Sequence, residues 1–474
     1  MRGALLVLGG LALGGLWVSS WRSKSGRSRD ARFATRRELT SLHAGALESQ
    51  RVPLGVLATG RWRRTGAFLA APEGDSVLVL GPTRSGKTSS IVIPALLSWE
   101  GPVLAASVKD DLVVETASWR RSSGAVGVLE PSEPSRPLAV RFDPVALSST
   151  FADARAVSAD LCGTSGDRNA SDEMAFWSQL SAKLLSSLLL AAFASGGDLE
   201  TVATWIDRRD ANTPFEALEA HGAERALDAL CASLAREERQ LGSVYATLES
   251  IVEPLRADLP DAQRVIDPAQ LLRGSETLYL CAPAHDQRRF RPLFTATTNA
   301  VLRAAFRQAR AEGGRLAAPL LVVLDEAAAI APLEELDVLA ATCSSHGITL
   351  VTCFQDLAQI SARYAERATT VVNNHRTRVV IGGLADQGAA SMLGTMTGTA
   401  RDKSRRPRSS DGASERRALI EPHELRGQPP FTGIVVSGRL RAARLSLVPF
   451  SARPALSVRA PRSPEGKRPR RLVR

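Results

Sequence analysis

Short apolar runs recur along the chain, and each is followed by a polar or helical stretch. Most of these runs lack a strict alternation of apolar and polar residues, as expected for strands that are covered on both faces. Strands that alternate with helices predict an α/β fold with a mainly parallel, doubly wound sheet. The runs are residues 77–80, 103–108, 125–129, 277–282, 320–324, 348–354, 377–381 and 434–437.

Between residues 143 and 268 the strand pattern disappears, and helical patterns replace it. This change predicts an all-α domain inserted into the α/β domain. Within it, residues 180–194 are apolar but include Lys183 and three serines. Because a charge at that position is costly inside a bilayer, we interpret this segment as a buried helix.

The first residues of the chain have the pattern of a membrane anchor. Residues 4–20 carry no charge and would span about 25 Å as a helix, which is the short end for crossing a bilayer. Trp17 and Trp21 stand where an interfacial belt is expected, and seven basic residues follow between 22 and 37. The pattern predicts a single N-terminal span in the inner membrane, with the bulk of the chain in the cytoplasm. A cleaved signal peptide is the alternative, although such a basic mature side would oppose translocation.

The net charge of +11 is concentrated in three segments. Residues 1–37 carry +7, residues 401–417 carry +4 and residues 451–474 carry +7, so the rest of the chain carries −7. We expect 401–417 to be a loop and 451–474 to be a disordered tail. Basic segments of this kind are either solvated or in contact with anionic lipid or nucleic acid, and the sequence leaves both open. The five cysteines are scattered, which favours neither a disulfide framework nor a zinc site.

The segment after the first apolar run has the pattern of a phosphate-binding loop. It reads Gly-Pro-Thr-Arg-Ser-Gly-Lys-Thr from 81 to 88 and opens a helical stretch. The glycines let backbone N–H groups point at phosphate oxygens, and the helix N-terminus adds a favourable dipole. We expect Lys87 to bridge the β- and γ-phosphates of ATP and Thr88 to ligate Mg²⁺. Pro94 predicts a kink or an early end of the helix. The predicted nucleotide-binding residues are Gly81, Pro82, Thr83, Arg84, Ser85, Gly86, Lys87, Thr88 and Ser89.

A second apolar run, residues 320–324, ends in the acidic pair Asp325 and Glu326. Two carboxylates at the end of a buried strand are costly unless they act on a cation or on water. We expect Asp325 to hold the Mg²⁺ shell and Glu326 to be the base that polarises the attacking water. Taken with Lys87, the pair predicts an ATPase.

Other polar residues follow the neighbouring apolar runs. Gln355 comes directly after 348–354, where a sensor of the γ-phosphate or of water is expected, and a polar helix cap is the alternative. Asp110 and Asp111 follow 103–108. We interpret these two as N-caps of the next helix rather than as groups of the site.

Together these motifs resemble the coupling-protein ATPases of type IV secretion and conjugation, the TraG/TraD/VirD4-like group. The resemblance extends over roughly residues 32–450, and its ordered set of motifs is more specific than the phosphate loop alone. The matching segments are residues 76–99, 101–112, 142–144 (Phe-Asp-Pro), 176–177 (Phe-Trp), 277–279 with Pro283, 325–326 and 354–359.

The resemblance implies a RecA-like P-loop NTPase that forms a homo-oligomeric, hexameric ring at the membrane. It implies an all-α domain at the cytoplasmic mouth of the ring and docking to type IV secretion channel components. The implied cargo is DNA, single-stranded and attached to a relaxase, or a secreted protein. Many members have two membrane helices, whereas one is visible in this sequence.

The chain departs from the family pattern at one position. The family commonly has an arginine about ten residues before the glutamine, which reaches the nucleotide of the neighbouring subunit. Residues 340–347 contain no arginine, and His346 is the basic residue there. Arg376 and Arg378 are possible replacements.

These observations predict a discontinuous ATPase domain over 38–145 and 268–450, with the all-α insertion at 146–267 and the anchor within 1–37. The leading functional hypothesis is a coupling ATPase that moves DNA or nucleoprotein into a secretion channel. A nucleotide-switched cargo receptor with little turnover is the first alternative, favoured by the absent arginine. A chromosome translocase of the cell-division type is the second, although that class usually has several membrane spans and a folded tail.

Overall fold

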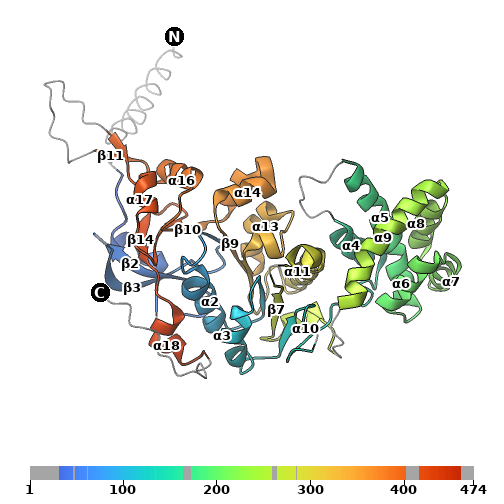
Figure 1. The fold of residues 1–474 in the computed structure, drawn as a ribbon. Helices are drawn as coiled ribbons and strands as arrows, with labels where there is room; N and C mark the ends of the chain where they lie inside the picture. Colours follow the sequence, from blue (N-terminus) through green and yellow to red (C-terminus); the bar gives the residue numbers. More distant parts are fainter. Residues whose placement is uncertain are drawn as a thin grey trace, which may run out of the picture.

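The computed structural model describes residues 31–45, 48–60, 62–133, 135–163, 172–258, 264–283, 285–401 and 416–460. Within these ranges, a mixed sheet of twelve strands runs through the molecule, and helices cover both of its faces (Figure 1). The strand order is β1-β3-β2-β14-β13-β10-β4-β9-β8-β5-β7-β6.

Seven adjacent strands of the sheet run parallel to one another. All seven were predicted as apolar runs, with bounds within one residue of those observed. Their carboxyl ends therefore meet at one edge, which we call the phosphate edge. The strands are β4 (Val77–Leu80), β5 (Val103–Ser107), β6 (Val126–Leu129), β7 (Thr277–Cys281), β8 (Leu320–Asp325), β9 (Ile348–Phe354) and β10 (Thr377–Ile381).

The other five strands extend the sheet beyond β10 in antiparallel pairs. One of them, β13, contains the predicted run 434–437, and the sequence pattern did not predict the rest. Several are short, and β3 contains charged and small residues that weaken the apolar signal. These strands are β1 (His43–Ala44), β2 (Pro53–Thr59), β3 (Arg63–Ala70), β13 (Thr432–Ser437) and β14 (Ala443–Ser446).

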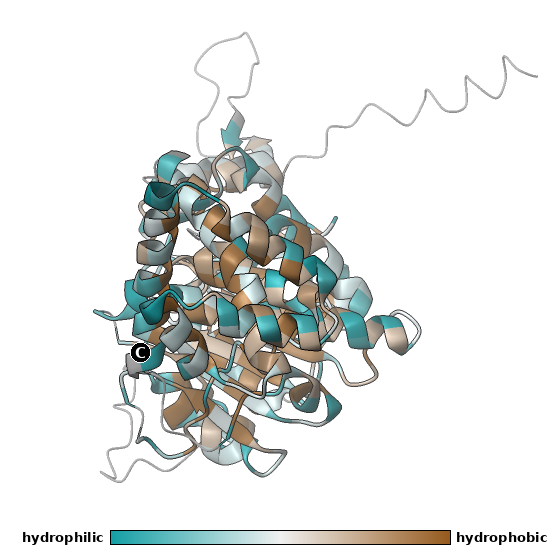
Figure 2. Ribbon diagram, turned by 90° about the vertical axis from the view of Figure 1, so that its right-hand side faces the viewer, coloured by the Kyte–Doolittle hydropathy of each residue, from teal (hydrophilic) through white to brown (hydrophobic). Residues whose placement is uncertain are grey.

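Each face of the sheet has its own apolar core. On β4, Leu78 and Leu80 belong to one core, whereas Val77 and Val79 belong to the other. Figure 2 shows hydrophobic residues concentrated where helices and strands pack together. The parallel strands are therefore buried on both faces, which explains why their sequences do not alternate.

The helices of the α/β part divide between the two faces. The face of Val77 is covered by η1 (Arg36–Leu42), η2 (Thr88–Val92), α2, α3 and α18, and the opposite face by α11 to α17. The helices are α2 (Ile93–Ser98), α3 (Asp111–Arg120), α10 (Pro268–Arg273), α11 (Gln287–Ala311), α12 (Ala327–Ile330), α13 (Leu336–Thr342), α14 (Leu357–Tyr364), α15 (Ala368–Asn374), α16 (Gln387–Thr397), α17 (Pro422–Arg426) and α18 (Pro454–Ser457).

In the described part of the chain, seven helices follow one another between β6 and β7, and the first six lie together at one side of the molecule (Figure 1). Their apolar residues join the core on the α11 side of the sheet. The six are α4 (Phe151–Cys162), α5 (Asp172–Ala194), α6 (Leu199–Arg208), α7 (Asn212–Ala220), α8 (Glu224–Leu234) and α9 (Glu238–Asp258).

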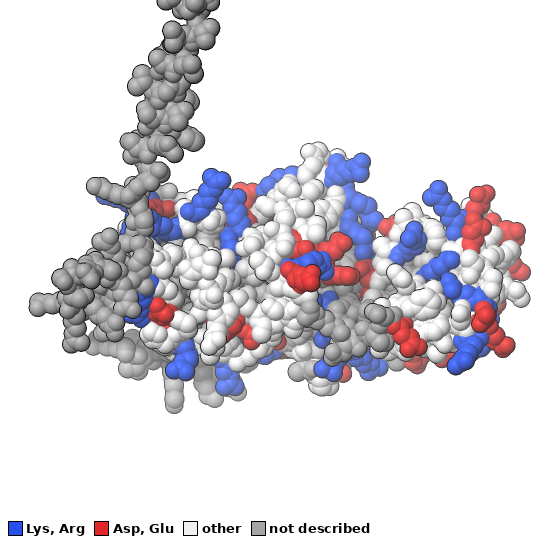
Figure 3. Space-filling model, turned by 90° about the horizontal axis from the view of Figure 1, so that it is seen from above, with Lys and Arg blue, Asp and Glu red and all other residues white. Residues whose placement is uncertain are grey.

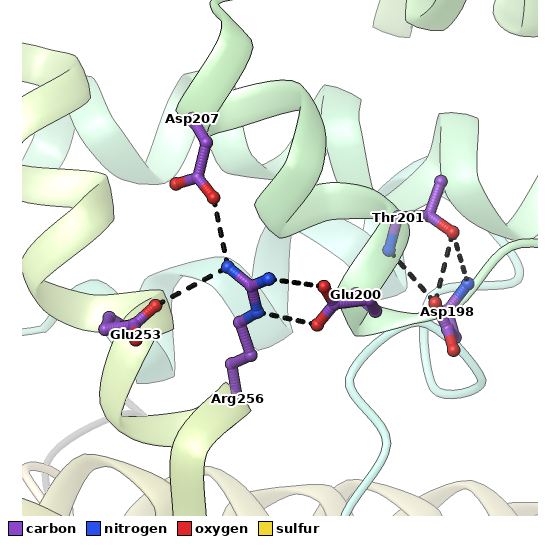
Figure 4. Close-up of polar contacts among 6 residues, drawn as sticks. All are labelled: Asp198, Glu200, Thr201, Asp207, Glu253 and Arg256. Atoms are coloured by element: carbon purple, nitrogen blue, oxygen red, sulfur yellow. Dashed lines mark hydrogen bonds and ion pairs between the residues drawn. The ribbon is translucent and has the colours of Figure 1, made fainter.

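An arginine joins two of these helices on the surface (Figure 4). Arg256 on α9 donates to both carboxylate oxygens of Glu200 and, at 3.0 Å, to Asp207, and both of these acidic residues lie on α6. A bidentate arginine in a network holds its geometry better than an isolated surface pair. The contact links α6 to α9 at the surface.

Among the described residues, Glu173–Ala194 of helix α5 is long and apolar enough to cross a membrane. Its most apolar part is 61% buried, Leu184 and Leu188 are fully buried, and the helix contacts α4 and α6 to α9. The predicted buried helix at 180–194 is confirmed. The predicted anchor at residues 4–20 lies outside the described residues.

Two segments expected to be irregular contain structure. Strands β11 (Thr399–Arg401) and β12 (Arg416–Ala418) pair at the ends of the predicted basic loop. The predicted disordered tail begins at residue 451, but residues 451–457 form a short turn and helix α18, with Leu456 buried. The expectation is wrong there because apolar contacts, which the basic composition obscures, hold this segment on α2.

A buried histidine links β9 to the start of β10. His375 is fully buried, and its Nδ1 lies 2.7 Å from the Val371 carbonyl, so Nδ1 carries the proton. Its Nε2 therefore accepts from the Thr352 hydroxyl at 2.8 Å. Burial is the main cause that lowers the pKa of His375 to about 4.

We expect this histidine to make the fold less stable in mild acid. The unfolded chain binds a proton near pH 6.5 and the folded chain only near pH 4, so stability is lost as pH falls through this window. The loss between pH 7 and pH 5 should be about 2 kcal/mol. Hydrogen exchange of the β9 and β10 amides at the two pH values measures it, with His375→Gln losing the share of the pH dependence that the histidine contributes and His221→Gln, which changes an exposed histidine, retaining it. An equal slope in wild type and His375→Gln would contradict the assignment.

Candidate functional site

The loop between β4 and η2 turns through left-handed backbone conformations. Arg84 and Gly86 have positive φ values of 60° and 97°. A Cβ atom at Gly86 would lie 2.8 Å from the ring of Phe431, and one at Gly81 would lie 2.9 Å from Cβ of Ile381. A larger side chain at Gly81 or Gly86 would therefore clash with these neighbours. The helix begins shortly after Gly86.

The helix that follows begins as a π-helix, η2, and continues as α2. The change occurs beside Pro94, and the helix continues past it to Ser98, so the predicted early end is wrong. Single π turns are often found at functional sites.

Lys87 lies under the loop and is only 6% exposed. Its ammonium group donates to the Gly81 carbonyl and, at 3.0 Å, to the Pro82 carbonyl. These bonds hold the charge at the centre of the turn formed by residues 81–87.

The loop meets the acidic pair at the phosphate edge. The Thr88 hydroxyl donates to Oδ2 of Asp325 at 2.7 Å, which joins residues 237 positions apart. Asp325 is 5% exposed, and its Oδ1 is buried without a hydrogen-bond partner. Burial is the main cause that raises the pKa of Asp325 to about 6, with Asp111 and Glu326 adding to the rise and Thr88 and Lys87 opposing it.

Glu326 follows at the start of α12 with φ 67° and ψ 54°. A left-handed backbone is uncommon for glutamate, and it directs the chain sharply away from β8. The residue is half-buried and lines a hollow of about 340 Å³ beside the loop. Most of the predicted loop residues also line it. The lining residues are Thr83 to Ser89, Ile93, Ser107 to Lys109, Asp111, Glu115, Asp325, Glu326, Phe431 and Phe450.

Gln355 lies beside the loop but outside this set of lining residues. Its neighbour Phe354 accepts from the Gly81 N–H at 3.2 Å, so Gln355 stands at the phosphate edge between β9 and β4. Its own backbone N–H donates to the side chain of Gln359. The N-cap of α14 is Asp356, so Gln355 does not have the capping role considered as its alternative.

Eight residues that line the hollow were not predicted as site residues, and four of these have acidic or aromatic side chains. Asp111 and Glu115 line it from α3, and burial raises the pKa of both. Asp110 occupies the predicted N-cap position of α3, but its side chain makes no cap bond there. The position of Asp111 after β5, at the same edge as Asp325, was a usable signal for the site. Phe431 and Phe450 had no comparable local signal.

These residues fit a magnesium nucleotide. The unpaired Oδ1 of Asp325 and the hydroxyl of Thr88 are oxygen ligands of the kind Mg²⁺ prefers. The glycine turn, the helix start and the buried ammonium of Lys87 together suit phosphate oxygens.

The basic residues considered as replacements for the missing arginine lie elsewhere. Arg376 is 70% exposed and lies 3.8 Å from Asp75, before β10 begins. Arg378 is within β10 and contacts the sulfur of Met396. His346, before β9, bonds to the Thr342 carbonyl. All three are at the amino ends of their strands, opposite the phosphate edge of the same chain.

Comparison with known proteins identifies the family. A family model described as type IV secretory system conjugative DNA transfer matches residues 19–438. The conjugal transfer protein TraG of Escherichia coli is 26% identical over 377 residues, which are 70% of this chain and 58% of that protein. VirD4 of Agrobacterium fabrum is 37% identical over 99 residues, which are 20% of this chain and 14% of that protein. The chain spans a little over half the length of the TraG relatives that it matches.

Among solved structures, the unbound bacterial conjugative coupling protein TrwB matches with a TM-score of 0.67 and 17% identity, over 89% of this chain and 93% of that chain. This similarity confirms the predicted RecA-like α/β fold. The chain belongs to the type IV secretory system conjugative DNA transfer family.

Proposed function

We propose that this protein is a coupling ATPase that binds ATP with Mg²⁺ and uses hydrolysis to move DNA or nucleoprotein into a type IV secretion channel. The bond between Thr88 and Asp325 carries the proposal, because it joins a phosphate loop to a buried carboxylate at one edge of the sheet. Family membership supplies the cargo class.

Each residue has a role in this proposal. The loop from Gly81 to Ser89 binds the phosphates through backbone N–H groups, and Lys87 neutralises the β- and γ-phosphate charge. Thr88 and Asp325 would hold Mg²⁺, which would supply further neutralisation of the phosphate oxygens. Glu326 orients a water molecule and accepts its proton as the water attacks the γ-phosphorus, and the bond from the γ-phosphorus to the bridging oxygen breaks to release ADP.

Solved structures of TrwB support the nucleotide assignment. They include a complex with ADP and Mg²⁺, at 16% identity, and complexes with non-hydrolysable ATP and GTP analogues. We propose by analogy that this chain binds the same class of ligand. Gln355 would then sense the γ-phosphate from its place beside Gly81.

We further propose that residues 4–20 anchor the chain in the inner membrane and that the cytoplasmic part assembles into a hexameric ring. In this arrangement 38–145 with 268–450 is the ATPase domain, and 146–267 is an all-α domain at the mouth of the ring. On the face shown in Figure 3, basic and acidic side chains are interspersed over the helical part of the molecule. Both signs of charge are therefore present on this face, which agrees with a net positive charge that is concentrated in the three basic segments.

A cargo receptor switched by nucleotide, with little turnover, is the second candidate. The absence of arginine from residues 340–347 favours it, because an arginine supplied by a neighbouring subunit accelerates hydrolysis strongly in P-loop enzymes. The two candidates bind nucleotide in the same way and differ in whether hydrolysis drives transport.

ATP hydrolysis by the full chain in detergent, measured with and without single-stranded DNA, tests the proposal. We expect DNA to raise the hydrolysis rate of the wild type several-fold. The Lys87→Ala variant should show only the background rate, with or without DNA. Rates that DNA does not change, in a sample shown to be assembled into rings, would refute the motor. Binding of ATP without any turnover would favour the receptor instead.

A further inference from the structure

Two phenylalanines reach the phosphate edge from the antiparallel part of the sheet. Strand β13 runs antiparallel to β10, so its beginning lies where the parallel strands end. Strand β14 returns beside β13, so its end lies at the same edge. Phe431 directly precedes β13, and Phe450 follows β14 by a few residues. The topology therefore places both at the hollow, although neither lies near the nucleotide motifs in sequence.

The backbone holds Phe431 in an unfavourable conformation. Its φ of 57° is in the left-handed region, which is strained for an aromatic residue. Its carbonyl accepts from the Leu447 N–H at 2.8 Å, which ties it to the end of β14. Its ring lies against Gly86, where an added Cβ would be 2.8 Å from two ring atoms. In this conformation Phe431 places an aromatic ring directly beside Gly86, the residue that precedes Lys87.

A buried arginine fixes the segment that carries Phe450. Arg453 is 5% exposed and donates to the Ser90 carbonyl at 3.1 Å and to the Val448 carbonyl at 3.0 Å. In an α-helix the Ser90 carbonyl would accept from residue 94, and Pro94 has no N–H to donate. Arg453 satisfies this carbonyl, and so the segment after β14 is attached to the helix that opens at the phosphate loop.

We propose that Phe431 and Phe450 form a subsite for the base of the bound nucleotide, which they hold by stacking. Both rings are only partly buried and line a hollow whose other walls include the loop and the acidic pair. An exposed apolar wall beside a phosphate site offers an aromatic surface for a flat ligand. This inference rests on the proposed nucleotide binding. It assigns a binding surface to the base, which is the part of the nucleotide that the loop does not contact.

Stacking without polar contacts accepts any purine, because each base has a π-face. The subsite therefore predicts that ATP and GTP bind with affinities within about threefold of each other. It also predicts that a ligand made of phosphates alone gains nothing from the two rings.

Calorimetric titration of the full chain with Mg²⁺ and either ATP or inorganic tripolyphosphate tests the inference. Phe450→Leu and Phe431→Leu should each weaken ATP binding about tenfold and leave tripolyphosphate binding within about twofold. Phe450→Tyr keeps an aromatic face and should retain ATP affinity. Lys87→Ala should weaken both ligands, and Phe193→Leu, which changes an exposed ring on α5, should change neither.

The outcomes separate this inference from the proposed function. Equal losses for ATP and tripolyphosphate in the leucine variants would overturn the subsite, because the rings would then shape only the loop. Unchanged ATP affinity, or a wild type that binds ATP no tighter than tripolyphosphate, would overturn it too. A wild type that binds neither ligand would overturn both proposals. If Lys87→Ala weakens binding and the phenylalanine variants do not, the phosphate site is supported and the subsite is overturned.

Discussion

Replacement of Glu326 by glutamine is expected to slow ATP hydrolysis about 10³-fold and to leave ATP affinity within about twofold. Glutamine keeps the size and the hydrogen-bonding reach of the side chain but cannot accept a proton from water. The carboxylate is half-buried at the wall of the hollow, whereas the phosphate contacts that we propose come from the loop and Lys87. In the proposed function, binding and chemistry therefore depend on different residues. Single-turnover hydrolysis and calorimetric titration of the full chain measure the two effects separately.

Glu334→Gln is a matched control, because it removes an exposed carboxylate a short distance along the chain. We expect it to hydrolyse ATP at the wild-type rate. A Glu326→Gln variant that keeps more than a tenth of the wild-type rate would show that another group activates the water. Asp111 and Glu115, which line the same hollow, would then be the groups to replace.

The same variant also separates the two candidate functions. A motor that cannot hydrolyse ATP should fail to move cargo even though it binds nucleotide. A receptor that is switched by binding alone should still deliver cargo when Glu326 is glutamine. Transport near the wild-type level would therefore favour the receptor.

The parallel core of the fold followed from the sequence because each of its strands is a continuous apolar run. A strand buried on both faces, such as β9, needs no information from distant residues to be identified. The antiparallel strands were harder to predict. In β3, for example, arginine, threonine and glycine are mixed with apolar residues. Its position is determined by pairing with β2, and pairing partners are not visible in a local pattern.

The residues of the site also differ in how far the sequence alone could predict them. Lys87, Thr88 and the acidic pair were predictable because each motif combines a strand end with a chemical group. The phenylalanines of the hollow were not, since the antiparallel return of β13 and β14 brings them there. The tail was misjudged for a related reason: the basic composition suggested solvation, yet Arg453 is buried against backbone carbonyls of the phosphate-loop helix and the chain after β14.

A second buried arginine holds the opposite edge of the sheet. Arg120, at the end of α3, is fully buried, and its guanidinium donates to the carbonyls of Trp99 and Gly101 and to the hydroxyl of Thr277. These acceptors belong to the turn before β5 and to the first residue of β7. Burial lowers the pKa of Arg120, although a guanidinium stays charged at neutral pH. One side chain therefore joins α3 to the amino ends of two neighbouring strands.

Arg120→Met is expected to destabilise this part of the fold by about 4 kcal/mol, because it leaves several buried acceptors without a donor. Hydrogen exchange of the β5 and β7 amides measures the loss locally, which is preferable to a global melting curve in a chain of several domains. Arg120→Lys keeps the charge but supplies fewer directed donors, and we expect it to restore part of the protection. Arg121→Met, which changes the exposed neighbour, should exchange as wild type does. Unchanged protection of β5 and β7 in Arg120→Met would mean that the carbonyls find other donors and that the arginine does not secure this edge.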